Sequence, residues 1–165
     1  WSGRGWAVEL SGRSESGFGA LDGHSGMQDL TAHHVGLTVS DLDRAVAFYR
    51  DTLGLELLSR FSVGGDEFAS GVGIPGASAD FAHLDAEGAR VELVEYEPAG
   101  DEATRARLNQ PGASHLGLEV DDLDGFYADL PDDVPTISEP QTTESGTRIC
   151  FLRDPDGHLV EVLEL

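Results

Sequence analysis

Two histidines and two glutamates occupy repeated positions in this chain. Residues 34–43 read HVGLTVSDLD, residues 115–124 read HLGLEVDDLD, and a later pair, 91–95 and 160–164, reads VELVE and VEVLE. Each half therefore supplies one histidine early (His34, His115) and one glutamate late (Glu92, Glu161). Internal repetition on this scale indicates a duplicated structural unit. Two imidazoles and two carboxylates form a ligand set suited to a divalent ion such as Zn, Ni, Co, Fe or Mn.

The elements that must position these residues can be predicted from the periodicity. Residues 33–39 and 114–120 alternate as half-buried strands, with each histidine opposite the apolar stripe. A helix follows each strand, from Ser40 or Asp41 to about Leu53, and from Asp121 or Asp122 to about Leu130. Further strands are expected at 55–63, 79–85, 89–96, 134–138, 147–152 and 158–164, with helical turns at 66–73 and about 102–108.

This order predicts an α+β fold of two tandem βαβββ modules, spanning 27–97 and 113–165 with a linker at 98–112. The two modules are expected to form a cup-shaped, eight-stranded mixed sheet with the helices outside. Residues 1–26 lack sustained periodicity and are expected to be a disordered leader or a tag.

Inside such a cup the four repeated side chains would converge on one metal ion. The alternative is that Glu92 and Glu161 are ordinary solvated residues of the repeat. The same alternation predicts that the side chains of Glu95 and Glu164 point away from the metal. Four other histidines remain: His24 in the expected leader, His33, facing the other way, His83, which could line the cup, and His158, expected at the surface.

The composition narrows the class of protein. The chain has 31 acidic and 10 basic residues, a formal net charge of −21, and no lysine. A protein with this charge repels a nucleic-acid backbone. The acidic composition resembles that of proteins from salt-accumulating cells, where a Debye length of about 3 Å at 1 M salt screens the repulsion between the protein's own charges. With no apolar run of roughly 18 residues and no secretory signal, we expect no membrane partner. The one cysteine, Cys150, is expected in the core and suits the cytoplasm.

The repeated motifs make the chain resemble the vicinal oxygen chelate superfamily, which includes glyoxalase I, methylmalonyl-CoA epimerase, extradiol dioxygenases, and fosfomycin and bleomycin resistance proteins. Besides the repeats, the matching segments are FY at 48–49, LGL at 53–55 and FLRDPDG at 151–157, and the resemblance covers about residues 31–165. Glyoxalase I carries the same His/Glu/His/Glu set as His34, Glu92, His115 and Glu161. Epimerases generally carry glutamine at the position of Glu92, dioxygenases and fosfomycin enzymes have no carboxylate there, and bleomycin-binding members lack the metal residues.

The resemblance implies a metal-dependent lyase or isomerase that converts a hemithioacetal of a 2-oxoaldehyde and a thiol to a 2-hydroxyacyl thioester through an enediolate. By resemblance Glu161 is the catalytic base and Glu92 its partner on the opposite face. The alternatives are a methylmalonyl-CoA-type epimerase, an extradiol-dioxygenase-like enzyme and a non-catalytic small-molecule binder. The expected partners are a hemithioacetal or acyl thioester and a second copy in a homodimer. Four arginines could receive an anionic thiol or CoA group, or form surface ion pairs: Arg60, Arg90, Arg148 and Arg153.

Overall fold

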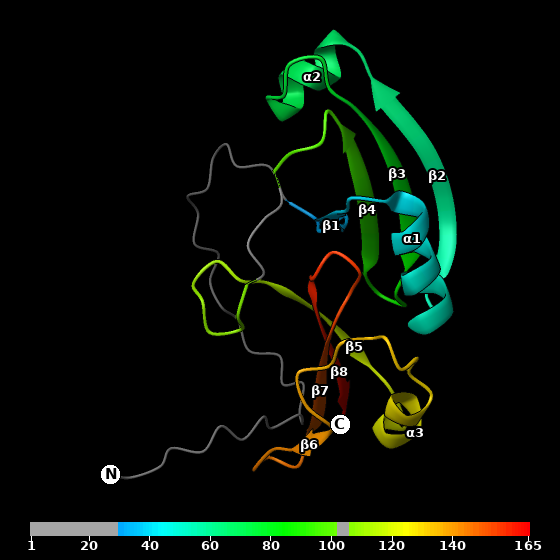
Figure 1. Ribbon diagram of the computed structural model, residues 1–165, viewed down its shortest axis with the longest axis vertical. Coiled ribbons are helices and arrows are strands. Elements are labelled where there is room, and N and C mark those ends of the chain that lie inside the picture. Colours follow the sequence, from blue (N-terminus) through cyan, green and yellow to red (C-terminus); the bar gives the residue numbers. More distant parts are fainter. Residues whose placement is uncertain (1–29, 102–105) are drawn as a thin grey trace, which may run out of the picture. The chain divides into compact units, whose positions relative to one another are not determined.

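The first half of the chain folds into a four-stranded mixed sheet with one helix across one face (Figure 1). The computed structural model describes residues 30–101 and 106–165, so the predicted leader at 1–26 lies outside the described residues. The strands lie in the order β1-β4-β3-β2, with β1 parallel to β4 and the other pairs antiparallel. The elements in chain order are β1 (Val35–Thr38), α1 (Leu42–Ala47), the π-helix η1 (Phe48–Thr52), β2 (Glu56–Gly64), α2 (Asp66–Val72), β3 (Ser78–Asp85) and β4 (Arg90–Glu97).

The second half repeats this arrangement in the order β5-β8-β7-β6, again with the first and last strands parallel. Its elements are β5 (His115–Glu119), α3 (Leu123–Ala128), β6 (Gln141–Thr142), β7 (Arg148–Arg153) and β8 (Leu159–Glu164). The predicted α+β class with two tandem modules is therefore confirmed. Within the one chain the eight strands form two sheets of four.

Equivalent aspartates begin the first helix of each module. The Asp41 carboxylate accepts a hydrogen bond from the Arg44 amide at 2.9 Å, and Asp122 accepts one from the Gly125 amide at 2.9 Å. Each bond satisfies one of the amides that a helix N-terminus leaves without an intrahelical partner. The predicted first helix continues through η1 and gives way to Gly54, whose φ of 76° favours glycine.

Each sheet has a helix-covered face, buried under α1 or α3, and an opposite face that we call the open face. On β4, Val91 and Leu93 are buried beneath α1, whereas Glu92 between them points to the open face. One apolar core combines helix-covered side chains of both sheets, including Leu84 of the first and Val160 of the second. The two open faces therefore point away from a core that the modules share.

A buried aspartate ties the modules together. Asp154, 3% exposed, lies in the turn before β8 and accepts a hydrogen bond from the Tyr49 hydroxyl of η1 at 3.1 Å. It also accepts bonds from His158 Nδ1 at 2.8 Å and from the backbone amides of Asp156 and His158 at 3.0 and 2.8 Å. Nearby, Asp156 accepts from the Ser40 hydroxyl at 2.5 Å. The turn that leads into β8 is thus anchored to the first module.

These contacts shift the pKa values of the groups involved. Burial of Asp154 opposes its ionisation, but the hydrogen bonds and charge of His158 outweigh it and hold the pKa of the carboxyl below its usual value. The hydrogen bond to Asp154 raises the pKa of His158 against the effect of burial. Burial, followed by the charge of Asp154, raises the pKa of Tyr49 and keeps its hydroxyl a donor. His158 is therefore partly exposed, with 31% of its side chain accessible, and it also holds the turn in place.

One predicted strand is absent from the structure, and one predicted turn lies largely outside the described residues. Residues 134–138 form no strand, because Pro135 has no amide to donate, and only Thr136 makes an isolated bridge with Leu152. The predicted turn at 102–108 falls largely on residues 102–105, which lie outside the described residues. Cys150 is 1% exposed as predicted, and burial raises the pKa of its thiol. In the described ranges, no helix has the length and apolar character to cross a membrane.

Candidate metal centre

The first His/Glu pair lies where β1 runs parallel to β4. Glu92 on β4 pairs with Gly36 on β1, and His34 directly precedes that strand. His34 Nε2 lies 3.3 Å from Glu92 Oε1, with the two side chains 37% and 14% exposed. A Cβ on Gly36 would lie 3.9 Å from both Glu92 Oε1 and the His34 ring, so a larger side chain would fill the space beside the pair. We call His34 and Glu92 the first half-site.

The second pair has the same geometry in the second sheet. Glu161 on β8 pairs with Gly117 on β5, and His115 is two residues before that glycine. His115 Nε2 lies 3.2 Å from Glu161 Oε2, with the two side chains 44% and 20% exposed. The repeated sequence therefore produces a repeated arrangement, and we call His115 and Glu161 the second half-site.

Each half-site fits two ligands of a single divalent ion. Metal–nitrogen and metal–oxygen bonds of about 2.1 Å place two ligands at roughly tetrahedral or right angles about 3.0 to 3.4 Å apart. The observed nitrogen–oxygen distances of 3.3 and 3.2 Å fall in this range. Imidazole nitrogen with carboxylate oxygen is also the donor chemistry that borderline divalent ions prefer.

The structure gathers the four predicted ligands into pairs. Across residues 30–101 and 106–165, no group of three or more histidine, cysteine, aspartate or glutamate side chains is arranged to hold a metal ion. The reason is the shared core, which turns the two open faces away from it. Sequence alternation placed His34 and His115 on the open faces, but it carried no information on which faces would meet.

A third histidine takes part in the first half-site. His83 on β3 lies opposite Glu92 in the strand register, and its Nε2 is 2.7 Å from Glu92 Oε2. The equivalent position in the second sheet, opposite Glu161, is Phe151. The prediction that His83 lies on the same face as the metal ligands agrees with this position. Its contact with Glu92 was missed because the cross-strand register was not predicted.

His33 departs from its predicted orientation. Its Nδ1 lies 2.8 Å from His34 Nδ1, and its Nε2 lies 3.0 Å from the guanidinium of Arg90. The two histidines precede the first residue of β1, so strand alternation does not govern them. His33 therefore lies beside the first half-site.

The two out-of-phase glutamates serve the fold, as their predicted direction suggests. Glu95 accepts a hydrogen bond from the Leu42 amide at 2.8 Å, and Glu164 accepts one from the Leu123 amide at 2.9 Å. Each carboxylate thus binds the first amide of α1 or α3 on the helix-covered face. The negative charge also suits a helix N-terminus.

All four nominated arginines contact the protein itself, Arg90 through His33 as described above. Arg60 pairs with Asp43 of α1 at 2.6 Å, and Arg148 pairs with Asp124 at 2.5 Å. Arg153 donates to the carbonyl oxygens of Gly157 and Ala106 at 2.7 and 2.8 Å. Of the two alternatives for Arg60 and Arg148, ion pairing within the chain is the one observed.

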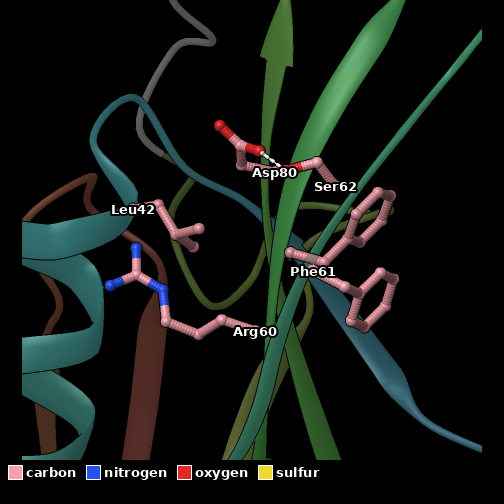
Figure 2. Close-up of a pocket in the computed structure, with 6 residues that line it drawn as sticks. Leu42, Arg60, Phe61, Ser62 and Asp80 are labelled. Carbon is pink, nitrogen blue, oxygen red and sulfur yellow. Dashed lines mark hydrogen bonds between the residues drawn. The ribbon is translucent and has the colours of Figure 1, made fainter.

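Two pockets lie away from the half-sites. One of about 290 Å³ is lined by Leu42, Arg60, Phe61, Ser62, Asp80 and Phe81. Figure 2 shows Leu42 and Arg60 on the α1 side of the strands, with Phe61 pointing the other way. A second of about 530 Å³ lies between η1 and the segment 131–135. Neither lining includes a residue of the two half-sites.

Known proteins share the sequence pattern and the fold of this chain. The family model for the glyoxalase/bleomycin resistance protein/dioxygenase superfamily matches residues 31–162. The chain belongs to this superfamily. A 2-epi-5-epi-valiolone epimerase from Actinomyces sp. is 28% identical over 82% of this chain and 80% of its own length. A probable lactoylglutathione lyase from Synechocystis sp. is 29% identical over 79% of this chain and 92% of its own length.

Solved structures agree on the fold of this superfamily member. A glyoxalase family protein from Bacillus cereus superposes with a TM-score of 0.75 at 23% identity, covering 85% of this chain and 97% of its own. The trypanothione-dependent glyoxalase I of Leishmania major gives a TM-score of 0.56 at 24% identity, covering 82% and 87%. At these identities the likeness bears on the fold alone.

Proposed function

We propose that this protein is a metal-dependent glyoxalase-like lyase/isomerase that converts a hemithioacetal to a 2-hydroxyacyl thioester. The observation that carries the proposal is the pair of matching half-sites, each with an imidazole nitrogen 3.2 to 3.3 Å from a carboxylate oxygen. Together they supply the His/Glu/His/Glu set that the resemblance associates with glyoxalase I. The similarity to a probable lactoylglutathione lyase adds support.

The site needs a second copy of the chain. Each half-site offers two ligands, and the shared core keeps the open faces of one chain apart. A twofold homodimer would place the first half-site of one copy against the second half-site of the other, and twofold symmetry would create this junction twice. Two equivalent four-ligand sites per dimer follow from this arrangement.

Within such a site the residues have separate roles. His34 and His115 would hold the ion through their Nε2 atoms, and Glu92 would supply a carboxylate ligand. A divalent ion bound there would polarise the substrate oxygens and stabilise the negative charge that develops on them. Glu161 removes the proton from the carbinol carbon of the hemithioacetal and returns it to the adjacent carbon.

Epimerisation is the second candidate, because the Actinomyces relative is named as an epimerase and matches most of both chains. Abstracting a proton from one face and delivering it to the other requires a proton-transfer group on each side of the substrate. Glu92 and Glu161 would have to share that task. Both candidates use the same four ligands.

The proposed function is tested by metal analysis and turnover. We expect protein purified at high salt without chelator to contain about one divalent ion per chain. The loaded protein should isomerise the methylglyoxal hemithioacetal of a thiol faster than it racemises a 2-methyl-branched acyl-CoA. Glu161→Gln should abolish turnover while retaining metal, because an amide oxygen still coordinates but cannot take the proton.

The matched control is Glu97→Gln, an exposed carboxylate at the end of β4 and outside the half-sites. It should leave turnover unchanged. Metal-free wild-type protein that cannot be loaded, or full turnover by Glu161→Gln, would contradict the proposal. Faster racemisation than isomerisation would select the epimerase.

A further inference from the structure

The two half-sites differ at one equivalent position. We infer that His83 is a positioning residue that fixes Glu92, while Glu161, facing Phe151, stays mobile enough to carry a proton. This inference rests on the proposed function for the presence of a metal. It goes further by making the two carboxylates unequal, and it favours a single-base isomerase over a two-base epimerase.

The strand registers establish the equivalence. β3 and β7 occupy the same place in the two sheets, next to the strand that bears the glutamate. His83 is the residue opposite Glu92, and Phe151 is the residue opposite Glu161. The symmetry of the duplicated modules is therefore broken directly beside the two carboxylates.

Both oxygens of Glu92 are engaged. Oε1 lies 3.3 Å from His34 Nε2, and Oε2 lies 2.7 Å from His83 Nε2. Because a carboxylate only accepts hydrogen bonds, Nε2 of His83 carries the proton and donates it to this contact. A donor on the second oxygen fixes the rotation of a metal-binding carboxylate.

The His83 ring is itself held in place. Its side chain is 14% exposed, and the edge of Phe61 meets it with ring centroids 5.1 Å apart and planes at 76°. Phe61 in turn stacks on Phe81 at 5.0 Å with nearly parallel planes. These contacts restrict the rotation of the His83 ring.

Glu161 has no such restraint. Phe151 has no polar hydrogen to offer, and its ring packs edge-on against His115 with centroids 5.5 Å apart. Among the residues that the structure describes, the one polar contact of the Glu161 carboxylate is His115 at 3.2 Å. Leaving a ligand position to take a proton would cost Glu161 one contact, whereas Glu92 would also break its bond to His83.

The test measures metal affinity and does not depend on turnover. We would titrate full-length protein with Co²⁺ at high salt against a competing chromophoric chelator, comparing wild type with His83→Asn and His83→Gln. The glutamine amide reaches the position of the imidazole Nε2, and the shorter asparagine amide does not. We expect His83→Asn to bind Co²⁺ about 10 to 100 times more weakly, and His83→Gln to recover most of that loss.

The reciprocal variant is Phe151→His, which gives Glu161 the donor that Glu92 has. We expect it to keep its Co²⁺ affinity and KM while kcat for the hemithioacetal falls at least about tenfold, the signature of a lost transition-state contribution. Equal Co²⁺ affinity in wild type and His83→Asn, or an unchanged kcat in Phe151→His, would overturn the inference. Wild type that binds Co²⁺ without hemithioacetal turnover would overturn the proposed reaction, and the His83 variants would still test the positioning role.

Discussion

Replacing Asp154 should weaken the whole fold, because this carboxylate receives four hydrogen bonds. Oδ1 accepts from two backbone amides, and Oδ2 accepts from Tyr49 and His158. In Asp154→Asn one of these oxygens becomes an amino group, which faces donors and leaves two of them unsatisfied. Each buried donor without a partner costs about 1 to 3 kcal/mol. The expected loss in free energy of unfolding is therefore about 2 to 6 kcal/mol.

Tyr49→Phe is the matched control. It removes one donor and leaves Asp154 three hydrogen bonds, so the expected loss is about 1 kcal/mol. Urea unfolding at high salt measures both variants, with an unchanged m value showing that only stability has changed. If Asp154→Asn lost less than about 1 kcal/mol, or Tyr49→Phe lost as much as Asp154→Asn, the four-bond account of this residue would be wrong.

Three further predictions concern pH, salt and metal. The pKa of His158 is raised in the folded state, so its contribution to folding stability is complete below the unfolded pKa of about 6.5 and is lost as pH rises through the folded pKa. The pKa of Asp154 is lowered, so its contribution to folding stability is complete above about pH 4 and is lost at lower pH. The urea midpoint of wild type should therefore exceed that of His158→Gln most between about pH 4 and 6.5, and a constant difference up to pH 9 would argue against it. With a net charge of −21, the melting temperature should fall as salt is lowered from about 2 M to 0.1 M, as scanning calorimetry would reveal. Dialysis against chelator should abolish turnover and re-addition of divalent ion restore it, whereas activity that survives complete metal removal would refute metal dependence.

The repeated motifs in the sequence predicted most of the fold. Because the two modules share their motif spacing, the same parallel register pairs Gly36 with Glu92 and Gly117 with Glu161. The strand alternation also separated Glu92 from Glu95, whose carboxylate binds the first amide of α1. The alternation is local, so periodicity is enough to predict it, whereas the parallel registers and the bond between Glu95 and Leu42 join distant segments and come from the structure.

Features that depend on contacts between distant segments were not predictable in the same way. The apolar stripes of α1 and α3 look the same whether they cover separate sheets or join one core, so the sequence could not place the open faces relative to each other. The contact of His83 with Glu92 depends on the register between β3 and β4, and the sequences of these long strands do not determine that register. The bond between Asp154 and Tyr49 joins residues 105 positions apart.

The most direct test of a site shared between two copies is complementation between half-site variants. One variant carries His34→Ala with Glu92→Ala, and the other carries His115→Ala with Glu161→Ala. In an equimolar, re-equilibrated mixture half of the dimers are mixed, and each mixed dimer contains one complete site of two. The account predicts that four-ligand Co²⁺ binding, absent from either variant alone, returns to about a quarter of the wild-type level. No recovery on mixing, with mixed dimers demonstrated by mass spectrometry, would contradict it.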